Sequence, residues 1–232
     1  MKKSLLSALL LSLSLSGLAQ AHDAWLAPQD SGWAVIYGHK GGLESYANDK
    51  VKQVKVLDAQ GKALDVQRQE TEQGVVLSFA GEPALATLVF DNGYWSKAPG
   101  GKTINVPKDE NQGATNGSHP VKFHKYVMNW TAQARQPVGE EAEIIALNKQ
   151  APKAGNKIDI QVLYQGQPAA GWAVGIDDSE DSPLKTDAQG KASFEVSPGR
   201  NFISASHSIA VQGDPKTDVN SISVNLIFNA AP

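Results

Sequence analysis

The chain has 232 residues, with 21 Lys and Arg against 24 Asp and Glu, two methionines and no cysteine. A net charge of −3 without basic clusters argues against nucleic-acid binding, and the lack of cysteine excludes disulfides and thiolate metal sites. A metal ion would therefore be bound by imidazole, amine or carboxylate groups, which suit nickel, cobalt, copper(II) and zinc.

Residues 1–21 are predicted to be a secretory signal. Lys2 and Lys3 precede an apolar stretch, Leu5 to Leu18, and Ala19-Gln20-Ala21 supplies a small-x-small cleavage site. The stretch is too short and too rich in serine for a membrane span. We expect cleavage after Ala21 and a periplasmic mature protein that does not itself span the membrane. Lys and Arg then fall from 21 to 19 against 24 Asp and Glu, so the net charge moves from −3 to about −5.

The mature chain has the pattern of an all-β protein. Short runs rich in Val, Ile and aromatic residues alternate with Gly, Asn, Asp and Pro, which favours antiparallel sandwiches over βαβ units. The segment 96–120 is predicted to be a long loop, and 123–130 fits either a strand or a short helix. The first predicted strands are 33–37, 52–57, 64–68, 75–79 and 86–90.

A polar segment rich in Pro, Gly and Asn indicates a boundary near residue 150. It divides the mature chain into an N-terminal β-sandwich, 22–150, and a smaller β-sandwich, 151–232, of prealbumin-like or fibronectin-like type. In the second module Asp187 is expected to cap a turn through its side chain, and Gly190 to supply a positive φ. Its predicted strands are 158–163, 172–176, 202–206 and 222–228.

All five histidines follow the predicted signal. Cleavage would give His22 a free α-amine beside its imidazole, and these two nitrogens can close a chelate ring on a transition metal. His39 and His207 each end a predicted strand, where a ligand is held firmly beside an open loop. His124, between two lysines, is a reserve ligand, and His119 lies in the predicted loop. The alternative interpretation is that His22 has no role in metal binding and is simply the residue at which the signal happens to end.

Short motifs resemble those of an exported bacterial family. The segment from Ala21 to Pro28 is similar to its mature start, His-Asp/Glu-x-Trp-Leu-x-Pro, and Tyr37-Gly38-His39 is similar to its next strand end. The segment from Ile158 to His207, through Thr186-Asp187-Ala188-Gln189-Gly190, resembles its closing part. That family, formerly of unknown function, is associated with nickel or cobalt uptake. The resemblance implies a periplasmic β-rich protein linked to metal import, and implies roles for His22, His39 and His207.

The expected function is therefore binding of a transition metal, nickel or cobalt before copper or zinc, and its supply to an uptake transporter in the membrane. We expect no enzymatic activity. Two alternatives remain open. An N-terminal histidine with a second histidine also forms the copper brace of copper carriers and of oxidative polysaccharide-active enzymes. Two small sandwiches also suit a metal-free interaction module.

Overall fold

The computed structural model describes residues 22–30, 32–39, 42–176 and 184–232, so the predicted signal segment 1–21 lies outside the described residues. The predicted all-β class is confirmed. The helices of the described residues are short 3₁₀ turns, and no helix among them is long and apolar enough to cross a membrane. These turns are η1 (Asn48–Lys50), η2 (Lys108–Glu110) and η3 (Ala132–Arg135).

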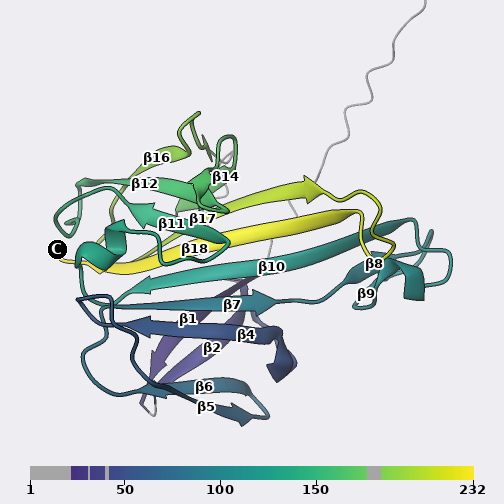
Figure 1. Ribbon diagram of the computed structural model, residues 1–232, viewed down its shortest axis with the longest axis horizontal. Coiled ribbons are helices and arrows are strands. Elements are labelled where there is room, and N and C mark those ends of the chain that lie inside the picture. Colours follow the sequence, from purple (N-terminus) through teal and green to yellow (C-terminus); the bar gives the residue numbers. More distant parts are fainter. Residues whose placement is uncertain (1–21, 31, 40–41, 177–183) are drawn as a thin grey trace, which may run out of the picture.

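The described strands form three sheets (Figure 1). The N-terminal sheet has the order β1-β2-β6-β5, with β3 beside β2: β1 (Asp23–Gln29), β2 (Gly32–His39), β6 (Gly74–Phe79), β5 (Val66–Thr71) and β3 (Gly42–Leu43). The third sheet contains β11 (Ala142–Ala146), β12 (Lys157–Tyr164), β13 (Gln167–Pro168) and β16 (Lys191–Glu195).

The central sheet lies between the other two. Its main path is β15 (Leu184–Lys185), β14 (Ala173–Ile176), β17 (Gly199–Ala210), β18 (Val219–Ala230), β10 (Asn116–Val127), β7 (Leu85–Asp91) and β4 (Val51–Leu57). Two short strands extend it beside the start of β10: β8 (Trp95–Lys97) and β9 (Thr103–Ile104).

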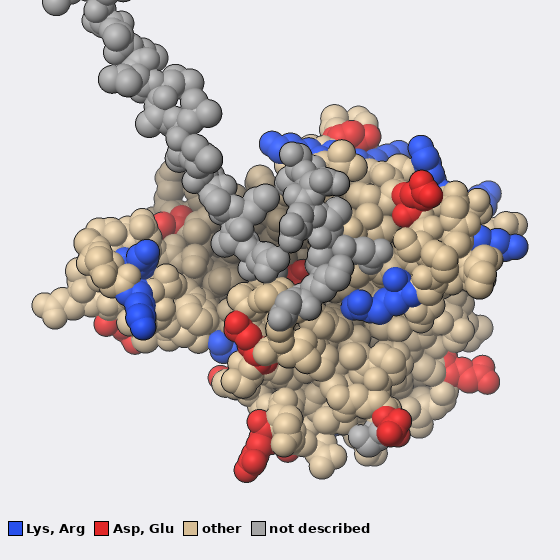
Figure 2. Space-filling model, turned by 180° about the vertical axis from the view of Figure 1, so that it is seen from behind, with Lys and Arg blue, Asp and Glu red and all other residues tan. Residues whose placement is uncertain are grey.

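On the face shown in Figure 2, acidic and basic side chains are interspersed, and neither kind gathers into one continuous patch.

Each face of the central sheet packs on a hydrophobic core. Since side chains alternate along a strand, Phe123 and Val224 pack toward the third sheet, whereas Tyr126 and Ile227 pack toward the N-terminal sheet. Strands β10 and β18 are thus covered on both sides. This double burial explains why every residue from Ile222 to Phe228 is buried, including Ser223 and Asn225.

The predicted boundary near residue 150 does not coincide with a break between sheets. Strands β10 and β18 come from opposite sides of it and pair in parallel from Ser118↔Val219 to Val127↔Phe228. Likewise, β11 pairs with β12 across it. The two predicted modules therefore share the central sheet.

Two segments whose structure was predicted only loosely, 96–120 and 123–130, both contain part of β10. The segment 96–120, expected as a long loop, is not one continuous loop: it contains part of β8, then β9, η2 and the start of β10, joined by turns. The segment 123–130, which fitted strand or helix, continues β10 as far as Val127. Pairing with β18 from Ser118 to Val127 explains why β10 both begins within the predicted loop and continues to Val127.

The predicted turn at Asp187 is confirmed. Asp187 Oδ1 accepts hydrogen bonds from the backbone N–H groups of Gln189 and Lys191, and Gly190 has φ +72°. The same hexapeptide, Asp-Ala-Gln-Gly-Lys-Ala, also occurs at 58–63, where Asp58 Oδ1 accepts the two equivalent bonds and Gly61 has φ +81°. A short sequence thus specifies the same turn at two places in the fold, after β4 and between β15 and β16.

A buried ion pair joins the central and third sheets. Lys125 on β10 and Glu143 on β11 are 2% and 4% exposed, and Lys125 Nζ lies 2.9 Å from Glu143 Oε2. The Glu143 carboxylate also accepts backbone N–H bonds from Val138, Gly139 and Glu140. Burial lowers the pKa of Lys125, and the charge of Glu143 opposes that shift. Each charge therefore depends on the other being present.

We expect Lys125→Met to lower the free energy of unfolding by about 3–5 kcal/mol, because it leaves a buried carboxylate without its cation. Urea denaturation measures this loss. Lys149→Met, at an exposed lysine, is the matched control and should change stability by less than about 0.5 kcal/mol. Equal unfolding midpoints for the two variants would contradict the assigned role of the ion pair.

Candidate metal centre at the start of the first strand

The structure brings His22 and His39 together. Strands β1 and β2 are antiparallel neighbours, and Asp23 pairs with Gly38, so the residue before Asp23 lies opposite the residue after Gly38. The two imidazole centroids are 5.0 Å apart with an interplanar angle of 64°. Two of the four predicted ligands are thus adjacent.

A tight reversal after β2 positions a third polar side chain. Gly38 has φ +148°, and a Cβ there would lie 2.5 Å from the backbone oxygen of Gly42, so the position requires glycine. The reversal pairs His39 with Gly42, and the N–H of Glu44 donates to the Tyr37 carbonyl at 2.9 Å. Glu44 is thereby returned to the end of β2.

Glu44 lies against His22. Its Oε1 is 2.7 Å from His22 Nε2, and the two side chains are 51% and 31% exposed. The contact is at ion-pair distance but is not aligned as a hydrogen bond.

Tyr37 packs against the cluster formed by His22, His39 and Glu44. Its ring stacks under His22 with centroids 5.5 Å apart, and packs on Phe90 on its other side at 5.0 Å. The hydroxyl accepts a hydrogen bond from Asn92 Nδ2 at 3.0 Å. Burial and, secondarily, the charge of Glu44 raise the pKa of Tyr37 to about 12. Tyr37 therefore stays neutral and supports the histidines as an aromatic surface.

His124, the predicted reserve ligand, lies inside the molecule and outside this cluster. It is 2% exposed, and its Nδ1 contacts Asn225 Oδ1 on β18. Asn225 Nδ2 donates to the Ala24 carbonyl at 3.1 Å, which fixes the amide orientation, so His124 Nδ1 must be the protonated nitrogen. The buried Nε2 is then a bare lone pair with no hydrogen-bond partner among the described residues. Of the flanking lysines, Lys125 faces the third sheet, whereas Lys122 shares the face of His124.

Burial lowers the pKa of His124 from 6.5 to about 3. Between these pH values the unfolded chain binds the proton more readily than the folded one, so stability falls as the pH drops below about 6.5, by up to about 1.4 kcal/mol per pH unit. We expect His124→Gln to reduce this fall, as measured by urea unfolding between pH 7 and 4. His207→Gln, at an exposed ring, is the control and should follow the wild-type curve. An unchanged slope in His124→Gln would refute the buried neutral imidazole.

The structure does not bring His207 to His22. On β17 it alternates in phase with Ile203 and Ala205, which face the third sheet, whereas His22 precedes a strand of the N-terminal sheet. Its ring stacks on Trp172 at 5.5 Å, beside a cavity of about 460 Å³. His207 and the His22–His39 pair therefore lie on opposite faces of the central sheet.

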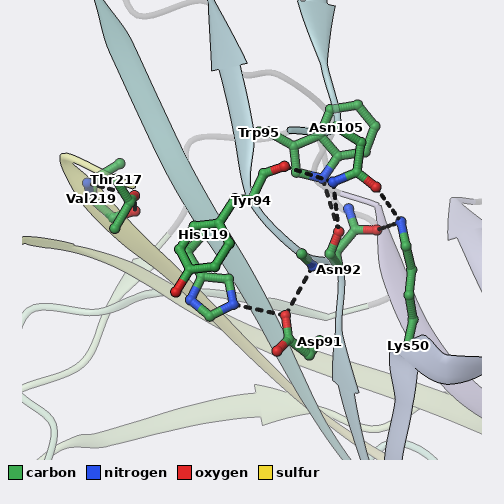
Figure 3. A network of polar contacts seen from close by, with 10 residues as sticks. Lys50, Asp91, Asn92, Tyr94, Trp95, Asn105, His119, Thr217 and Val219 are labelled. Carbon is green, nitrogen blue, oxygen red and sulfur yellow. Dashed lines mark hydrogen bonds and ion pairs between the residues drawn. The ribbon is translucent and has the colours of Figure 1, made fainter. Parts of the chain in front are cut away.

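His119 belongs to a separate polar network (Figure 3). Its Nε2 lies 2.7 Å from Asp91 Oδ1, and its ring stacks on Tyr94 with centroids 4.3 Å apart. The hydrogen bond to His119 is the largest cause that lowers the pKa of Asp91. Nearby, Lys50 Nζ donates to Asn92 and Asn105, which ties η1 to the β8–β9 region. These contacts give His119 a structural role.

The cluster offers imidazole and carboxylate groups to a cation, but no group of three or more His, Asp or Glu side chains among the described residues is already arranged around one point. Sequence reasoning found His22 and His39 and missed Glu44 and Tyr37. The signal for Glu44 was the Gly41-Gly42 pair after His39, which is typical of a chain reversal.

Fold and site together define the chain as an all-β protein of three layered sheets, with a histidine pair beside the start of its first strand. The chain belongs to the family described as a domain of unknown function, DUF4198, whose model matches residues 19–209. A Haemophilus influenzae protein described as uncharacterized is 33% identical over 218 residues, which is 92% of each chain. The D0-D1 domain of intimin aligns with 91% of this chain and 98% of its own at 13% identity, with a TM-score of 0.23, too low to support a structural conclusion.

Proposed function

We propose that the chain is exported, is cut after Ala21, and binds a transition metal ion, nickel or cobalt, through His22 and His39 for supply to an uptake transporter in the membrane. The observation that carries the proposal is the 5.0 Å approach of the two imidazoles at the start of β1. The association of the resembling family with nickel and cobalt uptake supports the choice of metal.

The position of Glu44 suggests which nitrogen of His22 binds the ion. A chelate ring from the α-amine closes most simply through Nδ1 of the same residue, which leaves Nε2 as an N–H donor. Glu44 Oε1 lies 2.7 Å from Nε2. Histidines that bind metals commonly donate their other ring N–H to a carboxylate, which fixes the tautomer and the ring orientation. Glu44 then orients His22, and His39 supplies the third nitrogen.

The test of the terminal chelate is calorimetric titration of nickel into protein that begins at His22 and into protein with one alanine ahead of it. Peptide formation removes the basic α-amine, so the extended form should bind at least tenfold more weakly. Binding to the native end should also weaken as the pH falls below about 7.7, because protons compete for the amine. Equal affinities for the two forms would rule out the chelate.

Side-chain substitutions separate ligand from orienting residue. We expect His39→Ala to abolish tight nickel binding and Glu44→Gln to weaken it by about 10–100-fold, the usual effect of losing an orienting carboxylate. His119→Ala is the matched control, since its ring lies in the Asp91–Tyr94 network, and it should bind nickel as the wild type does. A wild-type affinity in His39→Ala would remove His39 from the site.

Copper is the second candidate ion. An amine with two imidazoles binds copper(II) more tightly than nickel in solution, so the ligand set alone favours copper in vitro. Elemental analysis of protein purified from its own periplasm distinguishes the two, because availability in the cell decides which ion is acquired. Copper in stoichiometric amount would replace nickel and cobalt in the proposal and leave the ligands unchanged.

A further inference from the structure

Lys122 is a buried cation whose hydrogen bonding is incomplete. The residue is 5% exposed, and its ammonium group carries three N–H donors. Among the described residues its one hydrogen-bond acceptor is Ser223 Oγ, at the long distance of 3.4 Å. Burial lowers the pKa of Lys122, and the charge of Asp23 partly opposes that shift. Within the described part of the chain two of its donors thus have no acceptor, and a buried ammonium in that state is costly unless an acceptor binds it.

Lys122 lies in a row with two serines. The registers of β10, β18 and β17 place Lys122 beside Ser223, and Ser223 beside Ser206. Since side chains alternate, all three face the N-terminal-sheet side of the central sheet. Ser223 is 7% exposed and Ser206 is exposed, so this hydroxyl row, Lys122–Ser223–Ser206, leads from the ammonium toward solvent.

The hydroxyl row lies beside the start of β1. Asn225, two residues beyond Ser223 on the same face, holds the Ala24 carbonyl at 3.1 Å, and the charge of Asp23 acts on Lys122. His22 precedes Asp23 directly. A divalent cation at His22 would add to the positive charge of Lys122, and together they exceed the negative charges of Asp23 and Glu44. A further anion at the row would balance this excess.

We propose that the hydroxyl row binds a carboxylate of a small chelator that arrives together with the metal ion. This inference rests on the proposed function and specifies its substrate as a metal–carboxylate complex instead of a bare hydrated ion. The carboxylate accepts hydrogen bonds from Lys122 Nζ and from the hydroxyls of Ser223 and Ser206, and such charge-assisted bonds are stronger than neutral ones. The ion itself is held by His22 and His39.

The test is equilibrium dialysis of protein that begins at His22 against radiolabelled citrate, with and without one equivalent of nickel. We expect nickel-dependent retention of one citrate per chain. Titration of nickel alone, in a buffer that does not bind metal, measures bare-ion affinity separately. Citrate retained equally without nickel would overturn the claim that the chelator binds together with the metal.

Two variants address the row. Lys122→Met keeps most of the length of the side chain and removes the charge, so citrate retention should fall at least tenfold while nickel alone still binds. Ser206→Asp places a fixed carboxylate at the exposed end of the row, which should exclude citrate without disturbing the interior. Ser208→Asp, at an exposed serine one row further along, is its matched control and should retain citrate. Thermal unfolding confirms that each variant is folded.

The failures of the two proposals are distinguishable. If the wild-type protein retains nickel but no citrate when both are supplied, or if wild type and both row variants retain citrate equally, the inference is overturned and the proposed metal site stands. If the wild-type protein does not bind nickel, both the proposed metal site and the carboxylate site are overturned. Retention of citrate by Ser206→Asp together with its loss from Ser208→Asp would also overturn the row as the carboxylate site.

Discussion

The structure depends on the parallel pairing of β10 with β18 in a sheet that is covered on both faces. Water cannot reach most of these two strands, so every polar side chain on them needs a partner within the protein or a ligand. Lys125 is paired with Glu143, and His124 with Asn225. Bonding is less complete at two atoms: within the described residues His124 Nε2 has no hydrogen-bond partner, and the one acceptor for Lys122 Nζ is Ser223 Oγ at 3.4 Å. The same constraint that stabilises the cores thus leaves a buried cation, Lys122, within reach of the charge of Asp23 at the start of β1.

Local patterns predicted the local structure well. The strands at 33–37, 75–79 and 222–228 follow from runs of β-branched and aromatic residues, and the turn at Asp187 follows from its side chain and the glycine after it. The approach of His39 to His22 was likewise foreseeable, because a hairpin between neighbouring strands places one strand's start opposite the other's end.

Long-range placement could not be read in the same way. No local pattern near residue 150 predicts that β18 pairs with β10, because strand pairing depends on burial over the whole chain. His207 illustrates the consequence. Its position at the end of a strand was apparent, but the face it occupies depends on which sheet covers Ile203 and Ala205. Glu44 was missed because its contact with His22 arises from the geometry of the reversal at Gly38.

The bond from Asn225 to the Ala24 carbonyl has a kinetic consequence for the proposed cleavage after Ala21. Newly exposed chain ends ordinarily fray, and a frayed end would have to be recaptured each time it met its cargo. Here the anchor sits two residues inside the proposed cleavage point, so the end is docked before anything arrives. In the proposed function, capture of the ion would then require ordering one residue instead of a whole strand, which would favour rapid loading from a dilute surrounding pool.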